Sequence, residues 1–182
     1  MNIAIVGTGY VGLITAISLA LQNHKVICID TDKNKVLKIN KGESPFYEPR
    51  VDEYLKKILK KKTLRATDNL SDAILESDVT IIAVGTPTVK GKIDLSYIKT
   101  ASIQIGEALS KIKKYHVVAI KSTVLPGVTE RIVKPILEKY SNKKIGEFGL
   151  CMNPEFLREG NALEDALNPD RIIIGQIDDK SG

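Results

Sequence analysis

The sequence predicts an α/β protein: a doubly wound, mostly parallel sheet of the Rossmann type with helices on both faces. Short β-branched runs alternate with segments of helical periodicity along the 182 residues, a pattern typical of parallel strands joined by crossover helices. Several of these runs are apolar throughout, as expected for strands that helices cover on both sides. The first run is followed by the glycine pattern G-x-G-x-x-G, which opens many sheets of this class.

The expected elements follow in order along the chain. Strands are expected at 3–6, 25–30, 63–67, 79–84, 116–121, 148–152 and 171–175. Helices are expected at 11–22, 33–41, 50–62, 69–76, 95–112, 128–140 and 160–167. Asp32 and Asp94 precede two of these helices and are suited to cap their first turns. No repeat or linker interrupts the pattern, so residues 1–182 are expected to form a single domain.

Composition excludes some classes of protein and leaves others open. The net charge of +5 suits a phosphate-bearing ligand or a nucleic acid. The lysine run at 56–62 contains no aromatic residue, which favours a solvated helix face over a nucleic-acid patch. No apolar run approaches the ~20 residues that span a bilayer, and the first one ends in glycines, as a strand does and a signal peptide does not.

The two cysteines indicate neither a disulfide nor a metal site. Cys28 and Cys151 each lie inside an apolar run, and no CxxC or Cys/His ligand spacing is present. We therefore expect buried free thiols, as in a protein of the reducing cytoplasm.

The glycine pattern predicts a phosphate-binding turn. Gly7 permits the tight turn, Gly9 removes a side chain where a pyrophosphate approaches the backbone, and Gly12 lets the helix pack closely on the strand. The following helix offers free N–H groups and a partial positive charge at its start.

Asp30 at the end of the second strand predicts the choice of cofactor. Its carboxylate is placed to accept hydrogen bonds from the adenosine ribose and would repel a 2′-phosphate, so NAD is expected rather than NADP. Lys33 and Lys35 lie close by in the sequence and leave NADP as an alternative. The alternative role for Asp30 is to cap the helix at 33–41, a role for which Asp32 is better placed. NAD binding alone does not establish a reaction, since regulatory modules open in the same way.

Three later strands are followed by polar, turn-forming residues. These are Gly85, Thr86 and Pro87 after the fourth strand, Ser122 and Thr123 after the fifth, and the stretch MNPEFLREG after the sixth. The carboxyl ends of parallel strands border the ligand crevice, so these tails are expected to face one region. For Glu155 and Glu159 in the last stretch, the alternative is an acidic helix start that complements the helix dipole.

Seven stretches in this order resemble a known family: GTGYVG, ESPFYEP, VGTPT, DLSYI, KSTVLPG, NPEFLREG and NPDRIIIG. Together they are similar to the amino-terminal, NAD-binding domain of the UDP-glucose/GDP-mannose dehydrogenase family, most closely to its UDP-glucose-oxidising members. The likeness covers residues 1–178. Arg50 stands where the family usually has glycine. This difference affects only the expected conformation of the loop that contains ESPFYEP.

The resemblance implies an NAD-dependent oxidation of the C6 alcohol of a UDP-sugar to a carboxylate, with two NAD consumed. Thr123 and Glu155 would hold or activate a water near the reacting carbon, and Glu159 would assist that water or contact the nicotinamide. The backbone of Phe156, Leu157 and Arg158, next to Glu155, would clasp the sugar nucleotide. The residues implied to contact NAD are Gly7, Gly9, Tyr10, Val11, Gly12, Asp30, Lys35, Gly85, Thr86, Pro87, Thr123 and Glu159.

The family's nucleophilic cysteine lies in a second domain, and neither Cys28 nor Cys151 matches its motif. We therefore expect an isolated cofactor domain without the central helix, through which full-length members dimerise, and without turnover of its own. The alternatives are a stand-alone NAD-binding sensor or regulatory module, or a dehydrogenase that acts on GDP-mannose or a UDP-N-acetyl-hexosamine. No nucleic-acid or membrane partner is expected.

Overall fold

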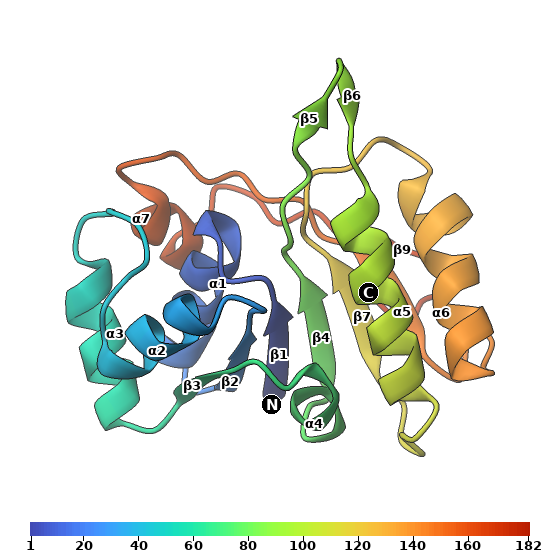
Figure 1. Ribbon diagram of the computed structural model, residues 1–182, viewed down its shortest axis with the longest axis horizontal. Helices are drawn as coiled ribbons and strands as arrows, with labels where there is room; N and C mark the ends of the chain where they lie inside the picture. The colour runs from blue at the N-terminus through green and yellow to red at the C-terminus, as the bar shows by residue number, and fades with distance from the viewer.

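A computed structural model describes all residues 1–182 as a seven-stranded sheet with helices on both faces (Figure 1). The strand order is β3-β2-β1-β4-β7-β8-β9, and every pairing from β3 to β8 is parallel. The strands are β1 (Asn2–Val6), β2 (Lys25–Ile29), β3 (Leu64–Thr67), β4 (Val79–Ile82), β7 (Val117–Ile120), β8 (Gly149–Met152) and β9 (Gly175–Gln176). This is the doubly wound, Rossmann-type sheet that the sequence predicts.

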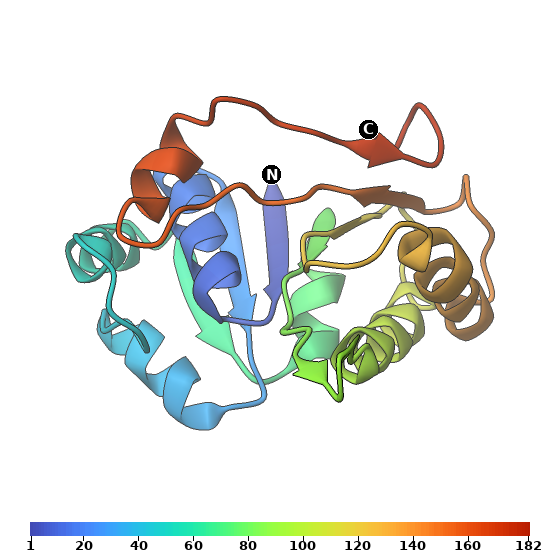
Figure 2. The ribbon, with the colours of Figure 1, turned by 90° about the horizontal axis from the view of Figure 1, so that it is seen from above.

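The helices divide between the two faces of the sheet (Figure 2). One face packs against α4 (Leu70–Leu75), α5 (Ser96–Leu109) and α6 (Lys134–Ser141), and the other against α1 (Tyr10–Leu21), α2 (Lys33–Lys41), α3 (Val51–Lys60) and α7 (Ala162–Leu167). Alternate residues of β1 enter the two cores, Ala4 and Val6 on one side and Ile3 and Ile5 on the other. The sheet is therefore covered on both sides, and its exposed carboxyl edge is left for a ligand.

Several sequence expectations hold at the level of single residues. Asp32 caps α2, since its carboxylate accepts hydrogen bonds from the Asn34 and Lys35 N–H groups. The lysines of the 56–62 run are exposed, while Ile58 between them is buried. Both cysteines are buried free thiols, and burial raises the pKa of Cys28 to about 12. Asp94 contributes less than expected: Leu95 is the cap residue of α5, and Asp94 accepts only the Ser96 N–H.

The predicted strand at 171–175 is wrong except at its end. Only Gly175 and Gln176 pair with β8, and they do so antiparallel. Ile172, Ile173 and Ile174 are exposed loop residues, at 70%, 48% and 46% of their full accessibility. Their β-branched side chains favour a strand, but β8 ends at Met152, which pairs with Gly175, so the residues before Gly175 have no strand residue of β8 opposite them.

Two helices differ from the prediction, one in its helix type and the other in its first residue. The helix expected at 128–140 begins as a π-helical turn, η1 (Thr129–Val133), and becomes α-helical from Lys134. Pro135 has no N–H to donate to the carbonyl four residues earlier, which explains the wider turn before it. The helix expected from 160 begins only at Ala162, because Gly160 has a φ of 83°, which a right-handed helix does not allow. The free N–H groups of Gly160 and Ala162 donate to the Glu48 carboxylate.

A hairpin between β4 and α5 has no counterpart among the predicted elements. Strands β5 (Thr88–Val89) and β6 (Lys92–Ile93) pair antiparallel and project from the carboxyl edge of the sheet (Figure 1). The turn residues Lys90 and Gly91 both have positive φ, at 50° and 75°, which matches the right-handed twist of a two-residue hairpin turn.

Candidate cofactor cleft and acidic segment

The glycine-rich turn joins β1 to α1 with very little free space. A Cβ on Gly7 would lie 2.6 Å from the Ala83 carbonyl oxygen, and one on Gly12 would lie 1.9 Å from that of Gly7. A Cβ on Gly9 would meet nothing within 4 Å. Gly7 and Gly12 are thus required for packing, whereas Gly9 leaves open space for a ligand to approach the backbone, as the sequence predicts.

The first turn of α1 presents unpaired N–H groups next to that space. Gly9 is the cap residue and offers no side chain to them, and the backbone N–H groups of Tyr10, Val11 and Gly12 donate to no other group of the chain. Free N–H groups and the partial positive charge of a helix start suit an anion such as a diphosphate.

Asp30 is held firmly at the carboxyl end of β2. Its Oδ2 accepts hydrogen bonds from the Thr8 backbone N–H at 2.9 Å and the Thr8 hydroxyl at 2.6 Å, and its Oδ1 accepts the Asp32 N–H at 3.0 Å. Lys35 Nζ lies 3.6 Å from Oδ2. Burial alone would raise the pKa of Asp30, but the hydrogen bonds from Thr8 and Asp32 and the Lys35 charge outweigh it and lower the pKa. The carboxylate is therefore ionised and fixed in place.

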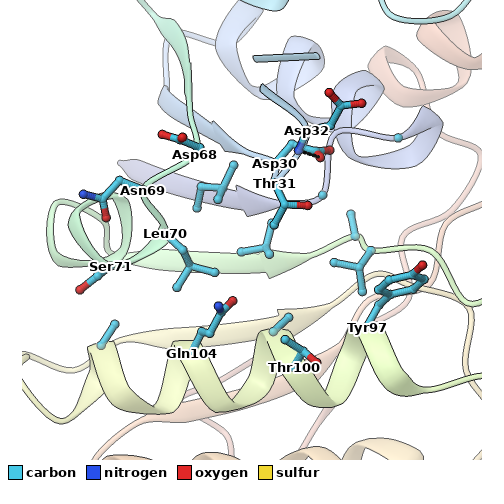
Figure 3. Close-up of a pocket in the computed structure, with 18 of the residues that line it drawn as sticks. Asp30, Thr31, Asp32, Asp68, Asn69, Leu70, Ser71, Tyr97, Thr100 and Gln104 are labelled. Atoms are coloured by element: carbon cyan, nitrogen blue, oxygen red, sulfur yellow. Dashed lines mark hydrogen bonds between the residues drawn. The ribbon is translucent and has the colours of Figure 1, made fainter. Parts of the chain in front are cut away.

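A cleft of about 950 Å³ runs between the turn, the end of β2, the start of α4 and the length of α5. In Figure 3, Asp30 and Thr31 face Leu70, Thr100 and Gln104 across this space. Five predicted cofactor residues line it, namely Gly7, Gly9, Asp30, Lys35 and Gly85. The opposite wall, formed by α4 and α5, was not predicted.

The tails of β4 and β7 lie side by side, as their order in the sheet requires. The Thr86 hydroxyl donates to the Thr123 carbonyl at 2.9 Å. The expectation that Ser122 presents its hydroxyl to the crevice is wrong: Ser122 is buried, and its hydroxyl donates to the Val84 carbonyl at 2.7 Å. This bond gives a partner both to the Ser122 hydroxyl and to the Val84 carbonyl, which buried polar groups need. Thr123 remains exposed, beside Thr86 and Pro87.

The segment 153–161 is an irregular loop after β8 and not a helix start. Glu155 folds back so that its carboxylate accepts the Leu157 N–H at 2.6 Å. The Asp165 carboxylate accepts the Arg158 N–H at 2.9 Å and also the Arg158 guanidinium. Glu159 is exposed and its side chain makes no hydrogen bond or ion pair. Glu155 and Glu159 therefore lie in the loop before α7, and the acidic residues in the first turn of that helix are Glu164 and Asp165.

A second cavity of about 740 Å³ lies beside this segment, on the α1 face of the sheet. It is lined by Glu155, Phe156, Leu157 and Arg158, and also by Lys121 at the end of β7. Lys121 donates to the Asn153 side-chain oxygen at 3.0 Å. Burial lowers the pKa of Lys121, and the Glu155 charge opposes that shift. Thr123 lines neither cavity and forms no hydrogen bond with Glu155.

The remaining predicted cofactor residue, Tyr10, turns its side chain away from the cleft. Its hydroxyl donates to the buried Glu48 carboxylate at 2.6 Å. No helix combines the length and apolar content that crossing a membrane requires. No three His, Cys, Asp or Glu side chains gather where they could hold a metal ion.

Comparisons with known proteins agree with this geometry. A family model described as the NAD-binding domain of the UDP-glucose/GDP-mannose dehydrogenase family matches residues 1–182. The GDP-mannose 6-dehydrogenase of Azotobacter vinelandii is 41% identical over 100% of this chain, and the UDP-glucose 6-dehydrogenase of Haloferax volcanii is 40% identical over 100%. The chain spans 42% of the length of each of these relatives.

Solved structures give the same result. A ternary complex of GDP-mannose dehydrogenase from Pseudomonas aeruginosa matches with a TM-score of 0.98 and 41% identity, covering 100% of this chain and 42% of that one. A UDP-glucose dehydrogenase from Pyrobaculum islandicum matches with a TM-score of 0.94 and 37% identity, covering 98% and 41%. An F420-dependent NADP-reductase from Arthrobacter, at 15% identity and a TM-score of 0.61, shares only the fold.

Proposed function

The chain belongs to the UDP-glucose/GDP-mannose dehydrogenase family, and from this premise we propose that it is the cofactor-binding part of a nucleotide-sugar 6-dehydrogenase. The observation that carries the proposal is the position of Glu155 and Glu159. They lie on a loop at the carboxyl edge of the sheet that also forms the NAD cleft, three strands along from β1. A sensor needs the cleft but gives these acids no role.

The residues of the cleft fit the binding of NAD. The free N–H groups at the start of α1 would bind the diphosphate through the open space at Gly9. The ionised Asp30 would accept hydrogen bonds from the adenosine ribose, where a 2′-phosphate would be repelled. Gly85, Thr86, Pro87 and Thr123 would line the path toward the nicotinamide. NAD supplies the hydride acceptor of the oxidation when it is bound.

The acidic segment would serve the sugar nucleotide. Glu155, Thr123 and Glu159 are the proposed catalytic residues: Glu155 would hold a proton or a water at the reacting carbon, with Thr123 and Glu159 assisting. Since the Leu157 and Arg158 N–H groups donate within the chain, the substrate would meet the Phe156 side chain and the carbonyl groups of this segment. The half-buried Lys121 lines the same cavity as Glu155 and would place a positive charge beside that carboxylate.

Two substrates have specific support. The motifs of the sequence favour UDP-glucose, whereas the larger structural likeness, 0.98 against 0.94 in TM-score, favours GDP-mannose. We place GDP-mannose first because relatives named for it match the whole chain at 41–42% identity, against 40% for the Haloferax volcanii relative named for UDP-glucose. The rest of the nucleotide sugar would be recognised by residues outside 1–182. The nucleophilic cysteine and the dimer contacts that the resemblance implies would also lie there.

Two measurements test this proposal. Calorimetric titration of this chain with NAD and with NADP is expected to give weak binding that prefers NAD; a preference for NADP would contradict the role of Asp30. A protein that carries this domain at the length of its relatives is expected to form two NADH per sugar with GDP-mannose or UDP-glucose. Chain 1–182 alone should form no NADH. If it did, the proposal that turnover needs residues outside 1–182 would be wrong.

A further inference from the structure

Glu48 connects three segments that are far apart in the sequence. Its side chain is buried, with 7% of the residue exposed. One carboxylate oxygen, Oε2, accepts the Tyr10 hydroxyl at 2.6 Å and the Gly160 N–H at 2.9 Å, and the other, Oε1, accepts the Ala162 N–H at 2.9 Å. Tyr10 begins α1 inside the glycine-rich motif, and Gly160 follows Glu159. A single carboxylate therefore bonds to the cofactor turn and to the end of the acidic segment.

The chemistry of this contact makes it rigid. Burial alone would raise the pKa of Glu48, but the Tyr10 hydroxyl and the Gly160 and Ala162 amides outweigh it and lower the pKa. Burial and the bond to Glu48 raise the pKa of Tyr10, so its hydroxyl remains a donor. The Tyr10 ring also packs against Phe46, with 5.1 Å between ring centroids. All the donors point at one ionised acceptor, and charge-assisted hydrogen bonds of this kind are the strong ones.

We propose that Glu48 is a positioning residue that couples the occupancy of the glycine-rich turn to the placement of the Glu155–Glu159 segment, through Tyr10 on one side and Gly160 and Ala162 on the other. This rests on the proposed function, since it assigns NAD to the turn and chemistry to the acids. A ligand that orders the backbone of Tyr10 also orders its hydroxyl, and thereby the carboxylate that holds the loop. Linkage makes the effect reciprocal: release of the loop must weaken NAD binding by the same factor.

Amide hydrogen exchange of the chain, without and with saturating NAD, tests this coupling. Without NAD, Glu48→Gln is expected to speed exchange about tenfold or more at Gly160 or at Ala162, because these two N–H groups donate to different carboxylate oxygens and the amide keeps only one oxygen. In the wild type, NAD is expected to slow exchange at these two amides about fivefold or more. Glu48→Gln should raise the Kd for NAD by at most that same factor.

Tyr10→Phe separates positioning from simple structural support. It leaves Glu48 bonded to both amides, so protection of Gly160 and Ala162 without NAD should persist while the response to NAD disappears. A merely structural carboxylate would give no such split. Glu43→Gln and Tyr47→Phe are matched controls, because both side chains are exposed in the same loop and make no hydrogen bond.

The outcomes are distinct. An unchanged NAD response in Tyr10→Phe would overturn the coupling and leave the proposed function standing. Retained protection of Gly160 and Ala162 in Glu48→Gln would overturn the role of the carboxylate. Failure of NAD to bind the wild type would overturn the proposed function and the coupling with it, while the protection that Glu48 gives in the free chain would still be measurable.

Discussion

The glycine-rich turn and the acidic segment 153–161 lie at the same edge of the sheet, but different forces hold them. The turn is fixed by contact between backbones: Gly7 packs on Ala83, and Gly12 on Gly7. The acidic segment is fixed by side chains that reach its backbone, namely Glu48, Glu155 and Asp165. The first region tolerates no added atom at Gly7 or Gly12, whereas the second depends on charge and hydrogen bonds and can be loosened without unfolding the protein.

Substitution of Gly12 should have the largest effect. A Cβ there would lie 1.9 Å from the Gly7 carbonyl oxygen, which exceeds the overpacking that costs ~1–3 kcal/mol in ordinary cores. Gly12→Val is expected to abolish cooperative thermal unfolding. Gly9→Val is the control: its Cβ meets nothing, so the melting temperature should stay close to that of the wild type while NAD binding is lost. Equal melting temperatures for the two variants would contradict the packing argument.

Acid should unfold the sheet that both regions share. His116 is 1% exposed, its Nε2 lies 2.8 Å from the Thr80 hydroxyl, and burial lowers its pKa to about 4. The unfolded chain takes this proton near pH 6.5, so stability is complete above that pH and is lost as the pH falls toward 4, by up to about 3 kcal/mol.

Urea unfolding at several pH values checks this. His116→Gln should flatten the pH dependence, and His24→Gln, at the surface, should leave it unchanged. A wild-type stability that is constant from pH 7 to pH 4 would rule out this contribution.

Asp30→Asn should weaken the cofactor side, and it also replaces one of the two oxygens that accept hydrogen bonds from Thr8 and Asp32. The neutral amide keeps the shape but loses the charge that favours ribose hydroxyls over a 2′-phosphate, so we expect about a tenfold weaker NAD affinity, or ~1.4 kcal/mol, and a smaller preference over NADP. Calorimetry with both dinucleotides measures the ratio. Asp32→Asn, which caps α2, is the neighbouring control and should leave that ratio as it is.

Glu155→Gln should have the smallest effect on this chain. Its amide oxygen can still accept the Leu157 N–H, so the free energy of unfolding should change by less than ~0.5 kcal/mol. If Glu155 has the proposed role as a base, the same change should remove turnover in a protein that carries this domain at the length of its relatives. If Glu155→Gln instead weakened NAD binding as much as Asp30→Asn, the two regions would belong to one site.

The sequence predicted the parts of the molecule that depend on local geometry. The Asp32 cap and the strands predicted before residue 153 depend on residues close together in the sequence, and these predictions were confirmed. The space around Gly7, Gly9 and Gly12 agrees with the predicted turn, while phosphate binding by that turn stays a prediction. The exposed Ile172–Ile174 stretch and the buried Ser122 hydroxyl were predicted wrongly, because strand pairing and buried hydrogen bonds depend on neighbours distant in the chain. Glu48 was missed for the same reason: its partners are 38 to 114 positions away.

The contact between Gly7 and Ala83 also sets an order of events during synthesis. The glycine turn and Asp30 leave the ribosome first, but the floor of the cleft at Val84 and Gly85 follows only some fifty residues later. A nascent chain that has made β1 to β3 can bury the apolar face of α1, yet it holds only half of the nucleotide cleft. The cleft is complete only once α5, which contributes Thr100 and Gln104, has also been made, so NAD can stabilise the growing protein only after the sheet has closed across its centre.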